Sequence, residues 1–377
     1  MFDKVIARLT ILAALVSSSF AFLLHSGCRA SNYQLDVFNK FCYSDLAVYV
    51  QEGVVAFSPN SPAVAPLSHV LLWIVGGIPA FEIKIVVLQI IIALTLVVTA
   101  LTLQIFRGGN TCDGLLFVVL PFTPLTLFIG FNLLAIAIAT IAIYLYKQNR
   151  DSYLPWVLFA VAIGFDGWTW IVAAAAVLYE VVSKRLVSLL KLFPIFVLTL
   201  GVINLPIALT TRNFFNITPT LGDGTAMYVL SLLGNFTPPT HFVPYYFAVL
   251  VLLAISVWLY YEYKKHHFRY EVVLLLFVCV QTYNTNAITP GDLVHVLWAL
   301  LLAYPVRKFV VTISSLFVVW VAAVWLHAEE LLGERGIDTQ WYVISVAVAW
   351  VSIFMCGLKA AEIVHTPGKD PVLNGTV

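Results

Sequence analysis

The sequence predicts an all-α polytopic membrane protein, a class supported by its composition, its hydropathy and the spacing of its apolar stretches. Of the 377 residues, 61% are hydrophobic and 10% are charged, and the mean hydropathy is +0.96. Because soluble proteins average about 25% charged residues, a water-soluble fold of this length could not bury so much apolar surface. Apolar stretches near the length that crosses a bilayer recur along the whole chain.

Twelve transmembrane helices are expected, each a largely apolar segment bounded by polar or turn-forming residues. The first lacks a small-residue cleavage site and is interpreted as a retained signal anchor. The predicted spans are residues 4–26, 83–106, 113–129, 131–146, 153–165, 168–182, 189–210, 242–262, 271–288, 291–304, 309–326 and 340–358.

Residues 63–79 are apolar, but prolines and glycines interrupt them, and they are predicted to form a juxtamembrane helix instead of a span. The distribution of basic residues supports this assignment. With the N-terminus inside, 15 of the 20 Lys and Arg residues fall on the inner side and 5 on the outer side, as the positive-inside rule requires. Counting 63–79 as a span would reverse every later loop and place the basic residues 264–269 outside.

The resulting topology is a single transmembrane domain over residues 1–377, in the cell membrane with both termini cytoplasmic. Residues 27–82 form the first outer loop with its juxtamembrane helices, and residues 359–377 form a cytoplasmic tail. The net charge of +1 argues against a nucleic-acid partner. Membrane lipids are expected to surround the apolar helices.

The five cysteines show no CxxC or metal-like spacing. Cys28 and Cys42 fall in one loop, where they could pair if the loop faces an oxidising compartment or remain unlinked thiols. No metal ligand is predicted, and dependence on a divalent metal is left open.

Residues 33–69 form the longest polar interval in the first half of the chain, and they contain Asp45 beside the outer membrane surface. A carboxylate near hydrocarbon is costly and is usually functional. Asp45 could act as a general base that deprotonates a bound hydroxyl. Alternatively, Ser44 and Asp45 could cap the helix that begins there, and the two roles are compatible.

Two motifs carry a resemblance to a known family. Asp-Leu-x-Val-Tyr at residues 45–49, followed by Gly53 and then Pro66-Leu67, resembles the first outer loop of GT-C superfamily glycosyltransferases. The most similar members are the bacterial polyprenol-phosphate-mannose-dependent α-mannosyltransferases. Residues 124–134 resemble the family's proline and Gly-Gln-x-Asn at the next outer turn, and both motifs occupy corresponding places in the predicted topology.

The resemblance implies a GT-C-like fold of about twelve transmembrane helices plus juxtamembrane helices in the first outer loop. It implies an enzyme, an inverting glycosyltransferase that moves a sugar, with mannose expected, from a polyprenyl-phosphate donor to a lipid or glycan acceptor. Asp45 then takes the role of general base, while Tyr49 and Asn132 are expected to bind substrate. The lipid-linked donor is a co-substrate, and no cofactor is implied.

Four further residues could contact substrate, and each has a structural alternative. Lys84 could bind the leaving phosphate or snorkel at the interface beside Glu82. His295, one turn into an outer helix entrance, could bond a phosphate oxygen or be a neutral core histidine. Asp166 and Trp168 could bind a sugar, or they could belong to an interfacial aromatic belt with an Asp-Gly turn.

The chain also departs from the family pattern. Ala65-Pro66 stands where Tyr-Pro-Pro is usual, Phe131 replaces the glutamine, and a lysine common near position 166 is replaced. A non-catalytic GT-C-like protein is therefore one alternative. A secondary transporter or lipid flippase is another, although such proteins place ionisable residues at mid-membrane depth, and most charges here lie at span ends.

Overall fold

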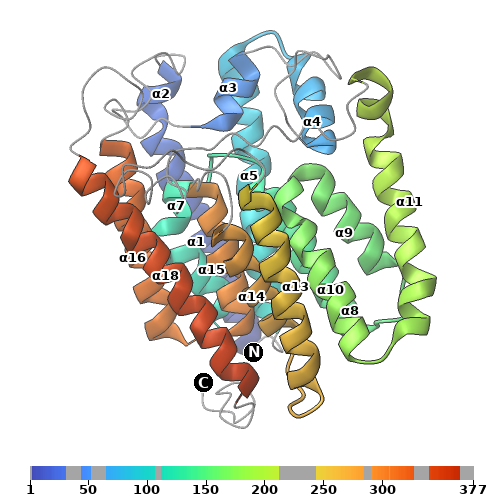
Figure 1. The fold of residues 1–377 in the computed structure, drawn as a ribbon. Helices are drawn as coiled ribbons and strands as arrows, with labels where there is room; N and C mark the ends of the chain where they lie inside the picture. Colours follow the sequence, from blue (N-terminus) through green and yellow to red (C-terminus); the bar gives the residue numbers. More distant parts are fainter. Residues whose placement is uncertain are drawn as a thin grey trace. The chain divides into compact units, whose positions relative to one another are not determined.

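The computed structural model describes residues 2–30, 44–51, 65–106, 112–211, 243–283, 290–304, 306–326 and 339–365, which contain helices and no strand (Figure 1). The prediction of an all-α protein is confirmed for this part of the chain. One element, η2, is a 3-10 helix. The helices are α1 Phe2–Leu24, α2 Ser26–Ala30, α3 Asp45–Gln51, α4 Pro66–Gly76, α5 Phe81–Ile105, α6 Asp113–Val119, α7 Phe122–Thr126, α8 Asn132–Gln148, α9 Leu154–Phe165, η2 Gly167–Thr169, α10 Trp170–Val182, α11 Leu186–Thr211, α13 Val243–Tyr263, α14 Tyr270–Tyr283, α15 Pro290–Ala303, α16 Arg307–Leu326 and α18 Thr339–His365.

Four described helical segments are long and apolar enough to cross a membrane. They are Lys4–Leu24, Phe81–Ile105, Leu186–Pro206 and Val346–His365. Helix α11 exposes large apolar side chains along its length, including Leu190 at 75% and Leu209 at 73%. Surfaces of this kind suit contact with lipid and not with water. The chain is therefore an all-α membrane protein.

The prediction of one continuous helix over 113–129 is wrong. Helix α6 ends at Val119, and α7 begins at Phe122. Between them Leu120 is extended, with φ −62° and ψ 131°, because it precedes Pro121 and a residue before proline is driven out of the helical region. The Thr123 hydroxyl donates to the Phe117 carbonyl, which satisfies a backbone acceptor near the break.

Two short helices, α3 and α4, lie in the loop where juxtamembrane helices are predicted. Helix α4 begins at Pro66 and ends before Gly77, so the prolines and glycines of this segment delimit the helix. The last helix, α18, is longer than the predicted span over 340–358, because it continues to His365. It therefore includes the first residues of the predicted cytoplasmic tail.

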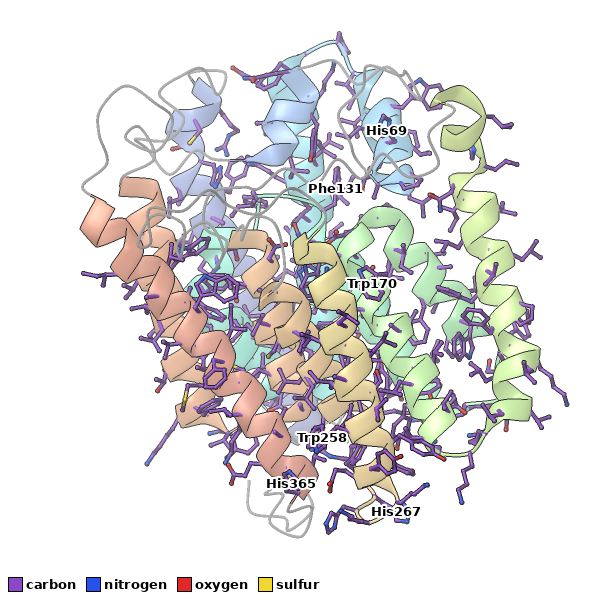
Figure 2. The ribbon with its side chains drawn as sticks, viewed as in Figure 1. His69, Phe131, Trp170, Trp258, His267 and His365 are labelled. Carbon is purple, nitrogen blue, oxygen red and sulfur yellow. The ribbon has the colours of Figure 1, made fainter. Side chains whose placement is uncertain are left out.

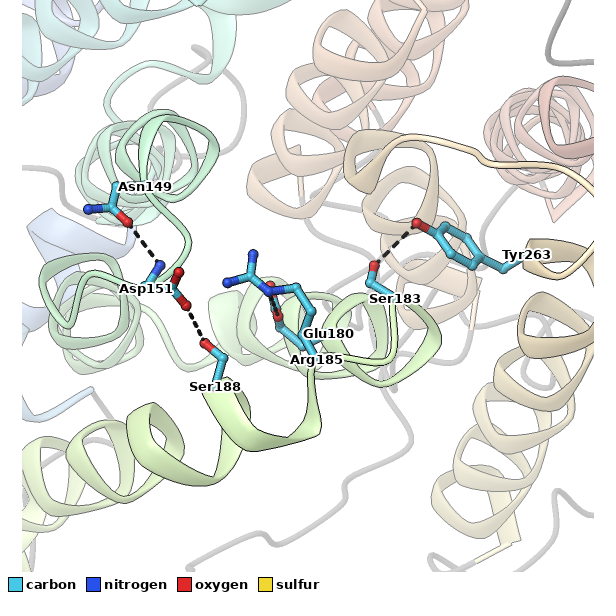
Figure 3. Close-up of polar contacts among 7 residues, drawn as sticks. All are labelled: Asn149, Asp151, Glu180, Ser183, Arg185, Ser188 and Tyr263. Carbon is cyan, nitrogen blue, oxygen red and sulfur yellow. Dashed lines mark hydrogen bonds and ion pairs between the residues drawn. The ribbon is translucent and has the colours of Figure 1, made fainter.

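The chain divides into two compact units, of which the first contains residues 1–173 and 187–216. In this unit α5 packs against α1, α3, α4, α6 and α8, and α2, α3 and α4 gather at its upper end in Figure 1. Helices α5 and α6 approach closely, because a Cβ added at Gly114 would lie 1.9 Å from the Ala100 carbonyl oxygen. Near the other end, Ser188 donates to Asp151 at 2.8 Å (Figure 3).

The second unit contains residues 174–186 and 217–377. Residues 291–303 of α15 are buried on every side, which makes α15 the central helix of the unit, packed by α14, α16 and α18. The Arg185 guanidinium lies 3.5 Å from the Glu180 carboxylate (Figure 3). The rings of Trp258 and His365 lie 5.5 Å apart (Figure 2). The prediction of a single domain stays a prediction.

Cys28 is disulfide-bonded, so the alternative of an unlinked thiol is wrong for Cys28; Cys42, with which it could pair, lies outside the described residues. Cys28 packs in a buried cluster with Ala47 of α3 and Ile85 of α5. The disulfide therefore sits against the helix that begins at Asp45. Cys112, Cys279 and Cys356 are free.

Candidate functional site

The first part of the candidate site is the beginning of α3. Helix α3 starts at Asp45, and the Ser44 carbonyl accepts from the Ala47 N–H at 3.1 Å, as expected for the residue before a helix. The Ser44 hydroxyl donates to the Phe128 carbonyl at 2.7 Å. The Leu46 N–H lies 3.4 Å from the Ile129 carbonyl. The chain around Asp45 is thus bonded to the turn before α8, while the Asp45 side chain itself lies outside the described part of the chain.

The second part is the contact between Asn132 and Asp166, two residues predicted separately from the sequence. Asn132 is the first residue of α8, and its amide donates to Asp166 Oδ2 at 3.2 Å. Asp166 Oδ1 accepts from the Trp168 backbone N–H at 3.0 Å. Asn132, Asp166 and Trp168 are all partly exposed. The structure therefore brings three predicted residues into one polar turn.

Local sequence explains why Asp166 occupies this turn. Helix α9 ends at Phe165, and Asp166 is extended, with φ −148° and ψ 112°. Its side chain caps η2, since aspartate is a strong acceptor for free N–H groups at a helix start. A carboxylate and a side-chain amide can both bond hydroxyl groups of a ligand. Trp170, 39% exposed at the start of α10 (Figure 2), adds an accessible indole.

Hydrogen bonds from two buried serines connect both parts of the site to the first-loop helices. Ser44 joins α3 to Phe128, and the Ser68 hydroxyl of α4 donates to the Phe165 carbonyl at 2.6 Å. Neither serine is a predicted ligand-binding residue. The local sequence shows only a serine at or beside a short apolar helix. It does not indicate the hydrogen bond, because the partner carbonyl lies 84 or 97 residues away.

Tyr49 and Lys84 belong to the adjoining layer of the same unit. Both are half-buried, Tyr49 on α3 and Lys84 in the first turn of α5, and these two helices pack together. Within the described residues no ion pair joins Lys84 to Glu82.

His295 belongs to the second unit and is described there by itself. It lies on α15, its side chain is fully buried, and its neighbour Asp292 in the first turn is 9% exposed. Full burial is what the core-histidine alternative predicts for His295.

His25 supports the turn that receives Ser44. It lies between α1 and α2, is 2% exposed, and its ring meets the Phe128 ring edge-on at 5.8 Å. Burial, with a smaller contribution from the positive charge of Arg29, lowers the pKa of His25 from 6.5 to about 4. A neutral imidazole therefore packs against Phe128 at pH 7.

The described residues contain no group of three or more His, Cys, Asp or Glu side chains that could hold one metal ion.

The chain matches no protein-family model, and no curated protein has a similar sequence.

Proposed function

We propose that this protein is an integral-membrane glycosyltransferase that uses a polyprenyl-phosphate sugar as donor. One observation carries the proposal: the start of α3, with Asp45, is hydrogen-bonded to Phe128 and Ile129, close to the Asn132–Asp166 pair. The helix that begins at Asp45 is thus bonded to the segment that leads into Asn132. Twelve spans, a GT-C-like architecture and mannose as the sugar are parts of this proposal.

In the proposed reaction Asp45 is the general base. It takes the proton from an acceptor hydroxyl as that oxygen bonds to the anomeric carbon, and the bond from this carbon to the phosphate oxygen breaks. The anomeric configuration inverts, and polyprenyl phosphate leaves with the negative charge. Lys84 is the proposed cation beside that charge, because it is half-buried on a helix that packs against α3.

The polar turn has the proposed role of binding the acceptor. A carboxylate and an amide can bond hydroxyl groups, and the partly exposed indoles of Trp168 and Trp170 can cover the apolar face of a sugar. Phe131, which stands in place of the motif's glutamine, is 6% exposed (Figure 2). Donor contacts made through that position in the family are therefore not part of the proposal.

The proposed orientation places the first loop and the polar turn on the outer face of the cell membrane, with both termini in the cytoplasm. The distribution of basic residues supports it. The disulfide of Cys28 supports it independently, because disulfides persist in oxidising compartments outside the cytosol.

The proposal is tested by substituting Asp45 in purified protein reconstituted into liposomes. With polyprenyl-phosphate mannose and a panel of lipid and glycan acceptors, Asp45→Asn should lower transfer at least about 100-fold while the protein stays folded. Asp151→Asn is a matched control, since this exposed aspartate bonds Ser188 away from the polar turn. Normal turnover by Asp45→Asn would reject the role of base. Movement of sugar or lipid across the membrane without a new glycosidic bond would indicate a transporter or flippase.

A further inference from the structure

The contact between α4 and the end of α9 lies directly beside the polar turn. Ser68 of α4 is fully buried, and its hydroxyl donates to the Phe165 carbonyl at 2.6 Å, across 97 residues of sequence. Phe165 is the last residue of α9. The hydrogen bond from α4 therefore ends one residue before Asp166.

Because Phe165 is the last residue of α9, this hydrogen bond fixes the end of the helix. The last four carbonyls of an α-helix have no partner within the helix, and a carbonyl that is partly shielded from water, as at Phe165, is stabilised by a hydrogen-bond donor. Ser68 supplies the partner for the final carbonyl of α9. Fixing this peptide group fixes the point at which the chain leaves the helix, and hence where Asp166 begins.

A second contact sets the same register. A Cβ added at Gly164 would lie 2.7 Å from Leu67 Cδ1 and 3.0 Å from Ile203 Cγ2 of α11, so the missing side chain allows α4 to approach α9. Two consecutive residues of α4, Leu67 and Ser68, thus meet two consecutive residues at the end of α9.

We propose that Ser68 is a positioning residue for acceptor binding, acting through Phe165 on Asp166; this inference rests on the proposed function. Through the Phe165 carbonyl, the α4 helix of the first loop holds Asp166 where it can accept from Asn132 and Trp168. The same loop carries Asp45. Ser68 therefore fixes the position of the acceptor-binding carboxylate without touching substrate itself.

The test compares Ser68→Ala with Ser352→Ala in full-length protein in liposomes. Ser352 is also fully buried, but its hydroxyl donates to Val348 within its own helix at 2.7 Å. Ser68→Ala should raise the acceptor KM about fivefold, the effect of one lost hydrogen bond, and leave the donor KM unchanged. Ser352→Ala should change neither constant. Hydrogen exchange of the backbone amides of residues 166–170 should accelerate in Ser68→Ala and not in the control.

The outcomes separate the two proposals. A wild-type protein that transfers sugar, with unchanged exchange at 166–170 or an unchanged acceptor KM in Ser68→Ala, would refute the role of Ser68 alone. A fall in kcat with both KM values unchanged would reflect loss of folded protein and would also refute it. A wild-type protein without transfer from any polyprenyl-phosphate sugar would refute the proposed function, whatever the exchange rates.

Discussion

His25 provides a quantitative prediction for the dependence of stability on pH. Its pKa falls from 6.5 to about 4 on folding, so the unfolded chain binds a proton at a higher pH than the folded protein. Stability from the neutral imidazole is fully present above pH 6.5 and is lost as the pH falls towards 4. The slope is about 1.4 kcal/mol per pH unit, which gives a loss of about 2 kcal/mol between pH 7.5 and pH 5.

The substitution His25→Gln isolates this contribution from carboxylates that also titrate. Reversible unfolding in mixed micelles, followed by far-ultraviolet circular dichroism at pH 7.5 and pH 5, gives the free energy of unfolding of each variant. We expect the wild-type protein to lose about 2 kcal/mol more than His25→Gln over this interval. The control is His267→Gln, because His267 is exposed, and it should follow the wild-type curve.

Equal pH dependence in wild type and His25→Gln would refute the assignment of a buried neutral imidazole. The consequence would reach the candidate site, because His25 packs against Phe128, whose carbonyl accepts from Ser44. A charged His25 at neutral pH would then lie beside the turn that holds the start of α3.

Two further experiments test the packing of α5 and the polar turn in the same unfolding assay. Gly114→Ala should lower the free energy of unfolding by about 2–3 kcal/mol, because the new Cβ would meet the α5 backbone at 1.9 Å; Gly201→Ala, with open space around the glycine, should change it by less than about 1 kcal/mol. Equal effects of the two would contradict the close approach. A double-mutant cycle of Asn132→Ala and Asp166→Ala should give a coupling of about 1 kcal/mol for their 3.2 Å hydrogen bond, and strictly additive effects would show that the two side chains do not interact.

In the polar turn, the sequence predicts individual residues but not the contacts between them. A motif selects Asn132, and the flanking tryptophans select Asp166, but neither pattern indicates that the two side chains meet. Ser44 is predicted as a helix cap, whereas its hydroxyl bonds the Phe128 carbonyl of another segment. The break in the expected helix over 113–129 is readable from Pro121 in retrospect, since the residue before a proline avoids the helical region.

The sequence by itself determined that this is a helical membrane protein and where most of its helices lie. Hydrocarbon requires continuous apolar segments whose backbone groups are bonded internally, and such segments are visible in the order of residues. Only the tertiary structure decided which polar groups meet. Ser44 with Phe128, Asn132 with Asp166, and Ser68 with Phe165 are separated by 84, 34 and 97 residues, and hydrogen bonds over such distances depend on how the helices pack.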